Sequence, residues 1–287
     1  MRSWLFVPAD SERKIEKAFL TEADVVILDL EDSVAPVRKA FARDCALAAR
    51  DMAPARTAIR INALDSGMVD ADIATVAAAA PALVVLPKAE GGASVAELAA
   101  RLAVAEAEAG LAEGAIGIMA IVTETASSLF QLGTYADSST RLCAMGWGAE
   151  DLSTALGASR TRCADTRLTG AFALARTLTL AGAHAAAASP LDAVFTALGD
   201  NAGLKAECEA AAADGFLGKM SIHPAQVPII NTAFTPSAAA VNAAERIVAA
   251  FDAAPDAGVL SLDGKMVDRP HLANAQRLLA RARALGV

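Results

Sequence analysis

The sequence has few cysteines and few histidines. Its 287 residues include four cysteines and three histidines, and Cys45, Cys143, Cys163 and Cys208 form neither a Cys-x-x-Cys pair nor a cluster with histidine. This scarcity argues against a disulfide scaffold and against a zinc site built on thiolates. We therefore expect reduced thiols and a cytoplasmic location.

The sequence also lacks a long hydrophobic run and an excess of positive charge. After Met1-Arg2, the run SWLFVP is too short for a secretory signal, and the alanine-rich stretch 74–87 is too short to cross a bilayer. The 25 basic and 33 acidic residues give a net charge of −8, which disfavours binding to nucleic acid or to anionic membranes. We expect a soluble protein with neither partner.

Hydrophobic residues make up 55% of the sequence. Many of them occur in short runs that alternate with longer, alanine-rich segments of helical period. The runs are Ser3–Val7, Val25–Leu30, Thr57–Ile61, Leu83–Leu86, Ile116–Val122, Leu142–Met145, His184–Ala188 and Lys219–Ile222. The first seven are each followed by a candidate helix. Nearly continuous apolar strands that alternate with helices indicate a parallel sheet covered on both faces. Eight such units predict an α/β fold, a (β/α)₈ TIM barrel.

The pattern changes after the eighth run. Ser237–Ala253 is predicted as a helix, Val259–Asp268 as a hairpin around Asp263-Gly264, and Pro270–Leu285 as a final helix. We therefore expect a barrel over residues 1–235 and a C-terminal helix–hairpin–helix extension over residues 236–287.

Charged and polar residues follow most of the predicted strands, where (β/α)₈ barrels carry their chemistry. They are Asp29, Glu31, Asp32, Arg60, Asn62, Lys88, Glu90, Glu124, Glu150, Asp151 and His223. The alternative is a solvated rim of loop charges. Carboxylates that converge on one barrel mouth need a cation, and oxygen ligands with few histidines indicate Mg²⁺ or Mn²⁺. Arg60 and Lys88 remain to face an anionic substrate.

The segment GWGAEDL at 146–152 has two glycines after a strand, as a dinucleotide-binding loop would. Asp151 stands where the third glycine belongs, however, and its charge would repel a phosphate. The sequence therefore argues against a Rossmann fingerprint.

Eight segments, taken in order, resemble the motifs of the citrate lyase β-subunit-like CoA-ester lyases of the HpcH/HpaI aldolase superfamily. They are RSWLFVPAD, VVILDLEDSV, RINALDS, VVLPKAE, TETASS, GWGAEDLSTALG, GKMSIHPAQV and DGKMVDRP. The resemblance implies a trimeric or hexameric (β/α)₈ barrel that holds Mg²⁺. It also implies cleavage or formation of a carbon–carbon bond between an acyl-CoA and a 2-keto acid.

By motif, the resemblance assigns Glu124 and Asp151 as metal ligands, with Glu124 also contacting the substrate. It assigns Arg60 as the substrate-binding and catalytic arginine, supported by Asp29, Glu31 and Asp32. For Asp29 the alternative is a strand-end residue that binds backbone amides. Lys88 is expected to form a salt bridge or to contact a CoA phosphate, since a Schiff base would be redundant beside a metal.

Three further residues depart from the family pattern, and the role of a fourth stays open. Thr123, Ser127 and Ser128 stand where the family has other residues, which predicts a more polar pocket floor. His223 is expected to be structural, with proton transfer as the alternative.

The hairpin motif DGKMVDRP resembles a lid whose aspartate, here Asp268, reaches the active site of a neighbouring subunit as acid/base. The alternative is that Asp268 only caps the last helix. The extension 236–287 is therefore expected to pack on a neighbouring subunit.

The activity expected is a Mg²⁺-dependent lyase acting on malyl-CoA or citramalyl-CoA. One alternative is the β-subunit of a citrate lyase complex that acts on a citryl thioester of an acyl carrier protein. The other is a non-catalytic paralogue that binds CoA esters, against which the intact Arg60, Glu124 and Asp151 argue.

Overall fold

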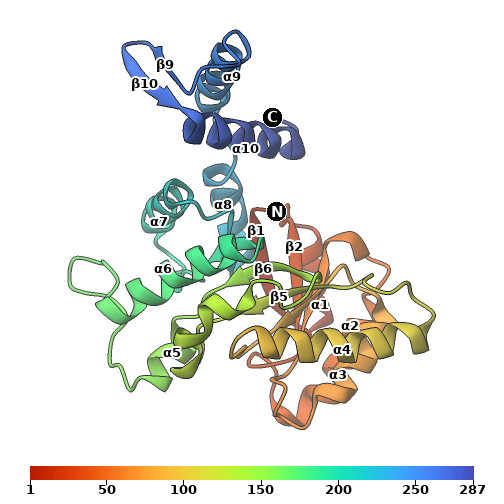
Figure 1. Cartoon of the computed structure of the whole chain (residues 1–287). Coiled ribbons are helices and arrows are strands. Elements are labelled where there is room, and N and C mark those ends of the chain that lie inside the picture. The colour runs from red at the N-terminus through yellow and green to blue at the C-terminus, as the bar shows by residue number, and fades with distance from the viewer. The chain divides into compact units, whose positions relative to one another are not determined.

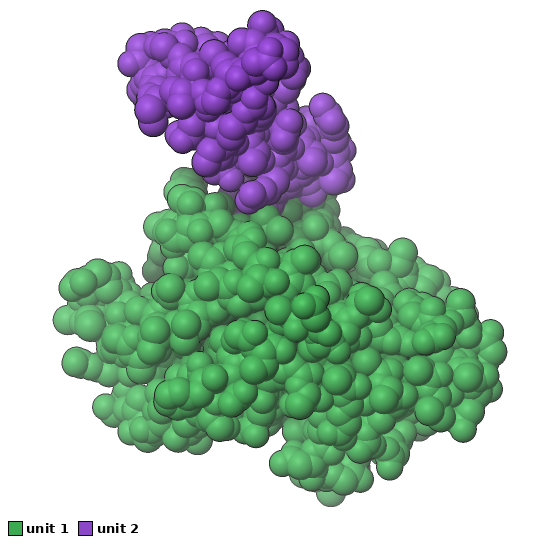
Figure 2. Space-filling model, viewed as in Figure 1, with its two compact units in different colours: residues 1–231 green, residues 232–287 purple.

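A computed structural model describes all residues, 1–287, and divides the chain into two compact units, Met1–Asn231 and Thr232–Val287 (Figure 2). The first unit is a closed barrel of eight parallel strands in sequential order, so the predicted (β/α)₈ barrel is confirmed. The strands are β1 (Ser3–Pro8), β2 (Val25–Asp29), β3 (Thr57–Arg60), β4 (Leu83–Leu86), β5 (Gly117–Ile121), β6 (Leu142–Gly146), β7 (Ser189–Asp192) and β8 (Gly218–Ser221).

Alternation along the strands builds two apolar layers. In β2, Val25 and Ile27 join the cluster that fills the barrel, whereas Val26 and Leu28 pack outward. The outward layer packs on the surrounding helices (Figure 1). These are α1 (Glu12–Phe19), α2 (Lys39–Ala48), α3 (Val69–Ala79), α4 (Gly92–Ala109), α5 (Glu150–Ala155), α6 (Gly170–Ala185), α7 (Asn201–Asp214) and α8 (Val227–Ala233). None of the helices combines the length and the apolar character needed to cross a bilayer.

Short 3₁₀ helices complete the connections of the barrel. They are η1 (Pro36–Arg38), η2 (Pro54–Arg56), η3 (Ser127–Tyr135) and η4 (Pro224–Gln226). The segment after β5 was expected to be helical, but it forms η3 and no α-helix.

The prediction of the seventh strand was wrong. Residues 184 and 185 end α6, and the strand is Ser189–Asp192. The run His184–Ala188 contains mostly alanine, the residue with the highest helix propensity, and no β-branched side chain. Ala187 then takes a left-handed conformation, with φ of 52°, that ends the helical segment. The strand Ser189–Asp192 could not be recognised from the sequence because it contains Pro190, and proline argues against a central strand.

The second unit contains α9 (Ala238–Asp252), the hairpin β9 (Val259–Leu262) and β10 (Lys265–Asp268), and α10 (Arg269–Leu285). The two strands pair antiparallel across a turn at Asp263-Gly264, both with positive φ, as two-residue hairpins require. Ala244, Ala275 and Leu279 form a small apolar core between the two helices. The role of this unit as a lid on a neighbouring subunit stays a prediction.

A buried ion pair stabilises the end of the barrel where the strands begin. Glu106 of α4 is fully buried and accepts hydrogen bonds from the Arg141 guanidinium and from the backbone N–H groups of Gly114 and Ile116, just ahead of β5. The hydrogen bonds from Arg141 lower the pKa of Glu106 to about 2. Because this value lies below the ordinary 4.5, the stabilisation is present above that pH and is lost as the pH falls towards 2.

We expect Glu106→Gln to destabilise the protein by about 3–5 kcal/mol at neutral pH, because the change leaves a buried arginine without its counter-charge. Chemical denaturation measures the effect. The control is Glu97→Gln on the same helix, where an exposed pair with Arg101 should contribute at most about 1 kcal/mol. Equal effects of the two substitutions would contradict a special role for the buried pair.

Candidate active site

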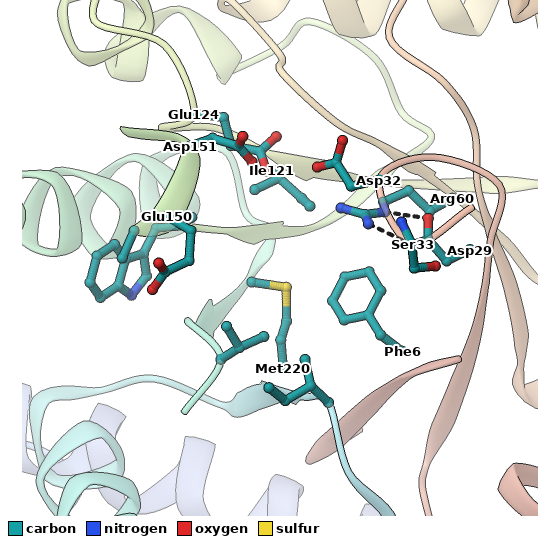
Figure 3. Close-up of a pocket in the computed structure, with 15 residues that line it drawn as sticks. Phe6, Asp29, Asp32, Ser33, Arg60, Ile121, Glu124, Glu150, Asp151 and Met220 are labelled. Atoms are coloured by element: carbon teal, nitrogen blue, oxygen red, sulfur yellow. Dashed lines mark hydrogen bonds and ion pairs between the residues drawn. The ribbon is translucent and has the colours of Figure 1, made fainter. Parts of the chain in front are cut away.

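A pocket of about 360 Å³ lies among the ends of the barrel strands and the loops that follow them (Figure 3). Its lining divides into acidic and apolar residues. The acidic side chains are Asp29, Asp32, Glu124, Glu150 and Asp151, and the apolar ones include Phe6, Ile121, Val194, Met220 and Ile222. Arg60 is the one basic side chain of the lining, and its guanidinium lies over the ring of Phe6 at 4.8 Å from the centroid. With five carboxyl groups and one guanidinium, the pocket suits a cation, and an anionic ligand would need that cation or Arg60 as its partner.

Arg60 is held in place by Asp29 of the neighbouring strand. Its Nε and NH2 atoms donate to the two oxygens of Asp29, each at 2.7 Å, because β2 and β3 pair these residues in register. Asp29 also accepts from the backbone N–H groups of Glu31 and Ser33, so both interactions considered for it are present. Burial alone would raise the pKa of Asp29, but Arg60 outweighs burial and holds it below its usual range. Arg60 is thereby fixed as a permanent cation.

Glu31 and Lys88 form a second ion pair beside Arg60. The Lys88 ammonium contacts Glu31 and lies 3.6 Å from Asp32, while Arg60 NH1 lies 3.0 Å from Glu31 Oε2. Burial raises the pKa of Glu31. Its Oε2 is buried and, despite the nearby guanidinium, accepts no aligned hydrogen bond. Glu31 is thus held between two cations, Arg60 and Lys88.

Glu124, in the loop after β5, is a buried carboxyl group of the pocket whose pKa is raised. It is 5% exposed, and burial raises its pKa to about 8, with the charge of Asp151 adding to the effect. Its Oε2 accepts from the backbone N–H of Lys88 at 2.6 Å. Lys88 has φ of 49°, a conformation rare for a residue with a side chain. That strained backbone lets one residue bind Glu124 through its N–H and Glu31 through its ammonium.

Asp151 lies in the first turn of α5, directly after the loop that joins β6 to this helix. Gly148 in this loop lies so close to Glu124 that a Cβ atom there would be 2.9 Å from Glu124 Cγ, and only glycine permits the approach. Thr123 exchanges hydrogen bonds with the backbone of Gly148. The carboxylates of Glu124 and Asp151 consequently lie close together, while Glu150 lies apart from them (Figure 3).

The pair Glu124 and Asp151 fits a hard divalent cation. No group of three or more His, Cys, Asp and Glu side chains could enclose a metal. Mg²⁺ does not need such a cage, since it is often bound by one or two carboxylates and completes its octahedron with water and substrate oxygens. Binding of a cation would offset the burial and the charge of Asp151 that together raise the pKa of Glu124.

Other predicted site residues lie elsewhere. Thr123, Ser127 and Ser128 do not line the pocket, so the expectation of a polar floor was wrong. Their hydroxyls instead contact Gly148, Glu90 and the backbone of Thr125. His223 is exposed and accepts from the N–H of Ala225, which caps η4. Asp268 belongs to the second unit, where it caps α10 and pairs with His271.

Two residues that support the site were missed from the sequence. Lys39, the first residue of α2, is buried and donates to the carbonyls of Leu30 and Glu31 and to Asn62 Oδ1, each at 2.7 Å. No sequence signal distinguishes it from a surface lysine. Asp192, at the end of β7, binds the Trp147 indole at 2.7 Å. The strand-end pattern would have identified Asp192 had β7 been placed correctly.

Comparison with known proteins identifies the family of this chain. A model of the HpcH/HpaI aldolase/citrate lyase family matches residues 2–224. A citrate lyase subunit beta-like protein of Mycobacterium tuberculosis (strain ATCC 25618 / H37Rv) is 39% identical over 279 residues, covering 97% of this chain and 94% of the relative. A (3S)-malyl-CoA thioesterase of Cereibacter sphaeroides (strain KD131 / KCTC 12085) is 36% identical over 289 residues, covering 99% and 95%.

Among solved structures, the protein CitE from Mycobacterium tuberculosis in complex with magnesium, acetoacetate and coenzyme A superimposes with a TM-score of 0.80. The two chains are 37% identical, and the match covers 98% of each. That relative thus binds a divalent metal, a keto acid and a CoA together on the fold described above.

Proposed function

The chain belongs to the HpcH/HpaI aldolase/citrate lyase family of lyases, and we propose that it cleaves or forms 2-hydroxyacyl-CoA thioesters such as malyl-CoA or citramalyl-CoA. The products of cleavage are acetyl-CoA and a 2-keto acid. The observation that carries the proposal is the convergence of Arg60, Glu124 and Asp151 on one pocket at the ends of the barrel strands.

Glu124 and Asp151 would hold Mg²⁺, or Mn²⁺ in its place. When bound, the metal supplies a Lewis acid for the keto oxygen and fixes the orientation of the acid. Glu31 and Asp32 lie beside Lys88, and Asp32 lines the same pocket. Lys88 pairs with Glu31 through its ammonium and positions Glu124 through its backbone N–H.

Arg60 would bind the substrate and offset the negative charge that develops on oxygen as the carbon–carbon bond breaks. Its planar fork is already aligned by Asp29, so little reorganisation is needed when charge appears. The apolar wall formed by Phe6, Ile121 and Met220 would exclude water from the enolate side of the reaction.

The reaction also needs an acid/base that exchanges a proton with the acetyl-CoA methyl group. Each carboxylate assigned above is either paired with a cation or belongs to the Glu124–Asp151 pair that would bind the metal. We assign this role to Asp268, supplied by the extension of a neighbouring subunit in a homotrimer or homohexamer.

The test is incubation of the pure protein with Mg²⁺ and a panel of 2-hydroxyacyl-CoA esters, with acetyl-CoA, keto acid and free thiol all quantified. The proposal predicts acetyl-CoA and keto acid in equal amounts, both dependent on Mg²⁺. Cleavage only of citryl-acyl carrier protein would favour a citrate lyase subunit. Binding of CoA esters without turnover would indicate a non-catalytic paralogue.

The relatives named (3S)-malyl-CoA thioesterase favour a second candidate function, hydrolysis of the thioester. The same assay separates the two activities. Hydrolysis releases free CoA and the intact hydroxy acid, whereas carbon–carbon cleavage leaves the thiol esterified.

We expect Arg60→Lys to lower the turnover rate by about 10²-fold or more, the scale for the loss of one donor to transition-state charge. Lysine keeps the positive charge but lacks the planar guanidinium that can bind Asp29 and the substrate at the same time. Steady-state kinetics measures the effect. Near-normal activity would mean that Arg60 serves only to neutralise Asp29 and Glu31.

A further inference from the structure

A buried ionic cluster lies directly behind the pocket wall. Asp192, at the end of β7, is 1% exposed and accepts from Trp147 Nε1 at 2.7 Å, from Lys219 Nζ at 2.8 Å and from Arg176 Nε at 3.3 Å. Lys219 of β8 is itself fully buried and also binds Glu207 Oε1 at 2.7 Å. None of the roles assigned above uses this cluster.

The cluster meets the pocket through Trp147 alone. Trp147 is 2% exposed, lines the pocket, and stands four residues before Asp151 in the loop between β6 and α5. Its neighbours Gly146 and Gly148 allow close packing, against Met119 and Met220 on one side and Glu124 on the other. The loop 147–149 that leads into Asp151 therefore has one large side chain, and that side chain is bound to Asp192.

The other tryptophan of the chain shows that this tie is not a general requirement of the barrel. Trp4 of β1 is equally buried, at 1% exposure, yet its Nε1 has no hydrogen-bond partner. The fold tolerates one unsatisfied indole N–H. At Trp147, by contrast, the indole binds a carboxylate that needs two buried or half-buried cations to remain charged.

A charged acceptor makes a shorter and stronger hydrogen bond than a neutral one. Burial alone would raise the pKa of Asp192, but Lys219 and Arg176 outweigh burial and hold it below its usual range. The carboxylate that accepts the hydrogen bond from the indole N–H is therefore a fixed anion, held by Lys219 of β8 and Arg176 of α6.

We propose that Asp192 is a positioning residue that, by binding the Trp147 indole, holds the loop 147–149 and the start of α5 so that Asp151 faces Glu124. This inference rests on the proposed function, in which those two carboxylates bind Mg²⁺. Loss of the anchor frees the loop and separates the two ligands, which weakens metal binding before any chemistry takes place.

The experiment measures Mg²⁺ affinity by calorimetry, without substrate, well below the unfolding temperature of every variant. Asp192→Asn keeps the size of the side chain but removes its charge, and we expect Mg²⁺ to bind about 10- to 100-fold more weakly, the usual range for groups that orient metal ligands. Trp147→Phe should weaken binding to a similar degree. Because both changes break one contact, the double variant should be no weaker than the worse single one.

Fluorescence gives a readout that does not depend on the metal. The chain has two tryptophans, so in a Trp4→Phe background the emission reports on Trp147 alone. Asp192→Asn should then lower its fluorescence anisotropy, because the indole is released.

Two controls separate positioning from stability. Glu106→Gln breaks another buried ion pair, at the opposite end of the barrel, and Trp4→Phe removes the unpartnered indole. Both should lower the unfolding temperature and leave Mg²⁺ affinity unchanged. Unchanged affinity in a folded Asp192→Asn protein would overturn the inference. If that variant does not fold, Trp147→Phe decides in the same way. Absence of Mg²⁺ binding in the wild-type protein would instead overturn the proposed function.

Discussion

Replacement of Glu124 by glutamine should abolish Mg²⁺ binding and reduce turnover to background, while the protein stays folded. Glutamine keeps the shape of the side chain and can still accept from the Lys88 N–H, but it lacks the charge that a hard cation requires. The carboxyl group is almost fully buried, and its burial disfavours the ionised form. We therefore expect the unfolding temperature of the metal-free variant to equal or exceed that of the wild type.

Calorimetric titration with Mg²⁺ and thermal unfolding of the same samples test this prediction. Glu150→Gln is the matched control, because Glu150 lines the same pocket yet lies apart from the Glu124–Asp151 pair (Figure 3). It should keep wild-type Mg²⁺ affinity, whereas Asp151→Asn should lose it. Wild-type affinity in Glu124→Gln would remove this residue from the metal site.

The barrel and most of the pocket could be predicted because their signals are local. The run Val25–Leu30 ends in Asp29, and the run Thr57–Ile61 ends around Arg60, so the strand assignments bring their terminal charges to the same barrel mouth. The register that pairs Asp29 with Arg60 follows once β2 and β3 are adjacent. The roles proposed for these residues follow from the family resemblance, because spacing alone does not distinguish a metal ligand from a substrate-binding residue.

What could not be predicted depends on non-local contacts. Lys39 is buried because the loop after β2 folds over it, and Lys219 because β8 meets β7 beside Asp192. Sequence spacing contains neither fact. The alanine run at 184–188 shows the same limit, since an apolar segment without β-branched residues extends a helix as readily as it begins a strand.

Replacement of Asp268 by asparagine should remove the acid/base and little else. Within its own chain Asp268 is the N-cap of α10 and accepts from the N–H of His271. The hydrogen bond from His271 lowers the pKa of Asp268, so the group is ionised at neutral pH, as a base must be. Asparagine caps helices about as well as aspartate, and the helix should therefore persist.

We expect Asp268→Asn to bind Mg²⁺ and keto acid normally and to keep the oligomeric state of the wild type. Its turnover should fall by about 10²- to 10⁴-fold, the contribution of a positioned acid/base, together with deuterium exchange into the acetyl-CoA methyl group. Kinetics and mass spectrometry of the recovered acetyl-CoA measure the two losses. Asp263→Asn is the matched control, because Asp263 lies at the turn of the same hairpin and pairs only with the exposed Arg246.

Mixing two inactive variants tests whether the aspartate acts across subunits. Asp268→Asn protein retains the metal ligands, and Glu124→Gln protein retains the aspartate, so hybrid oligomers would contain some complete sites. Partial recovery of activity after subunit exchange is the expected result. No recovery, with exchange of subunits verified by mass, would place acid/base and metal site within one chain. If Asp268→Asn exchanges deuterium at the wild-type rate, the residue serves only as the cap of α10.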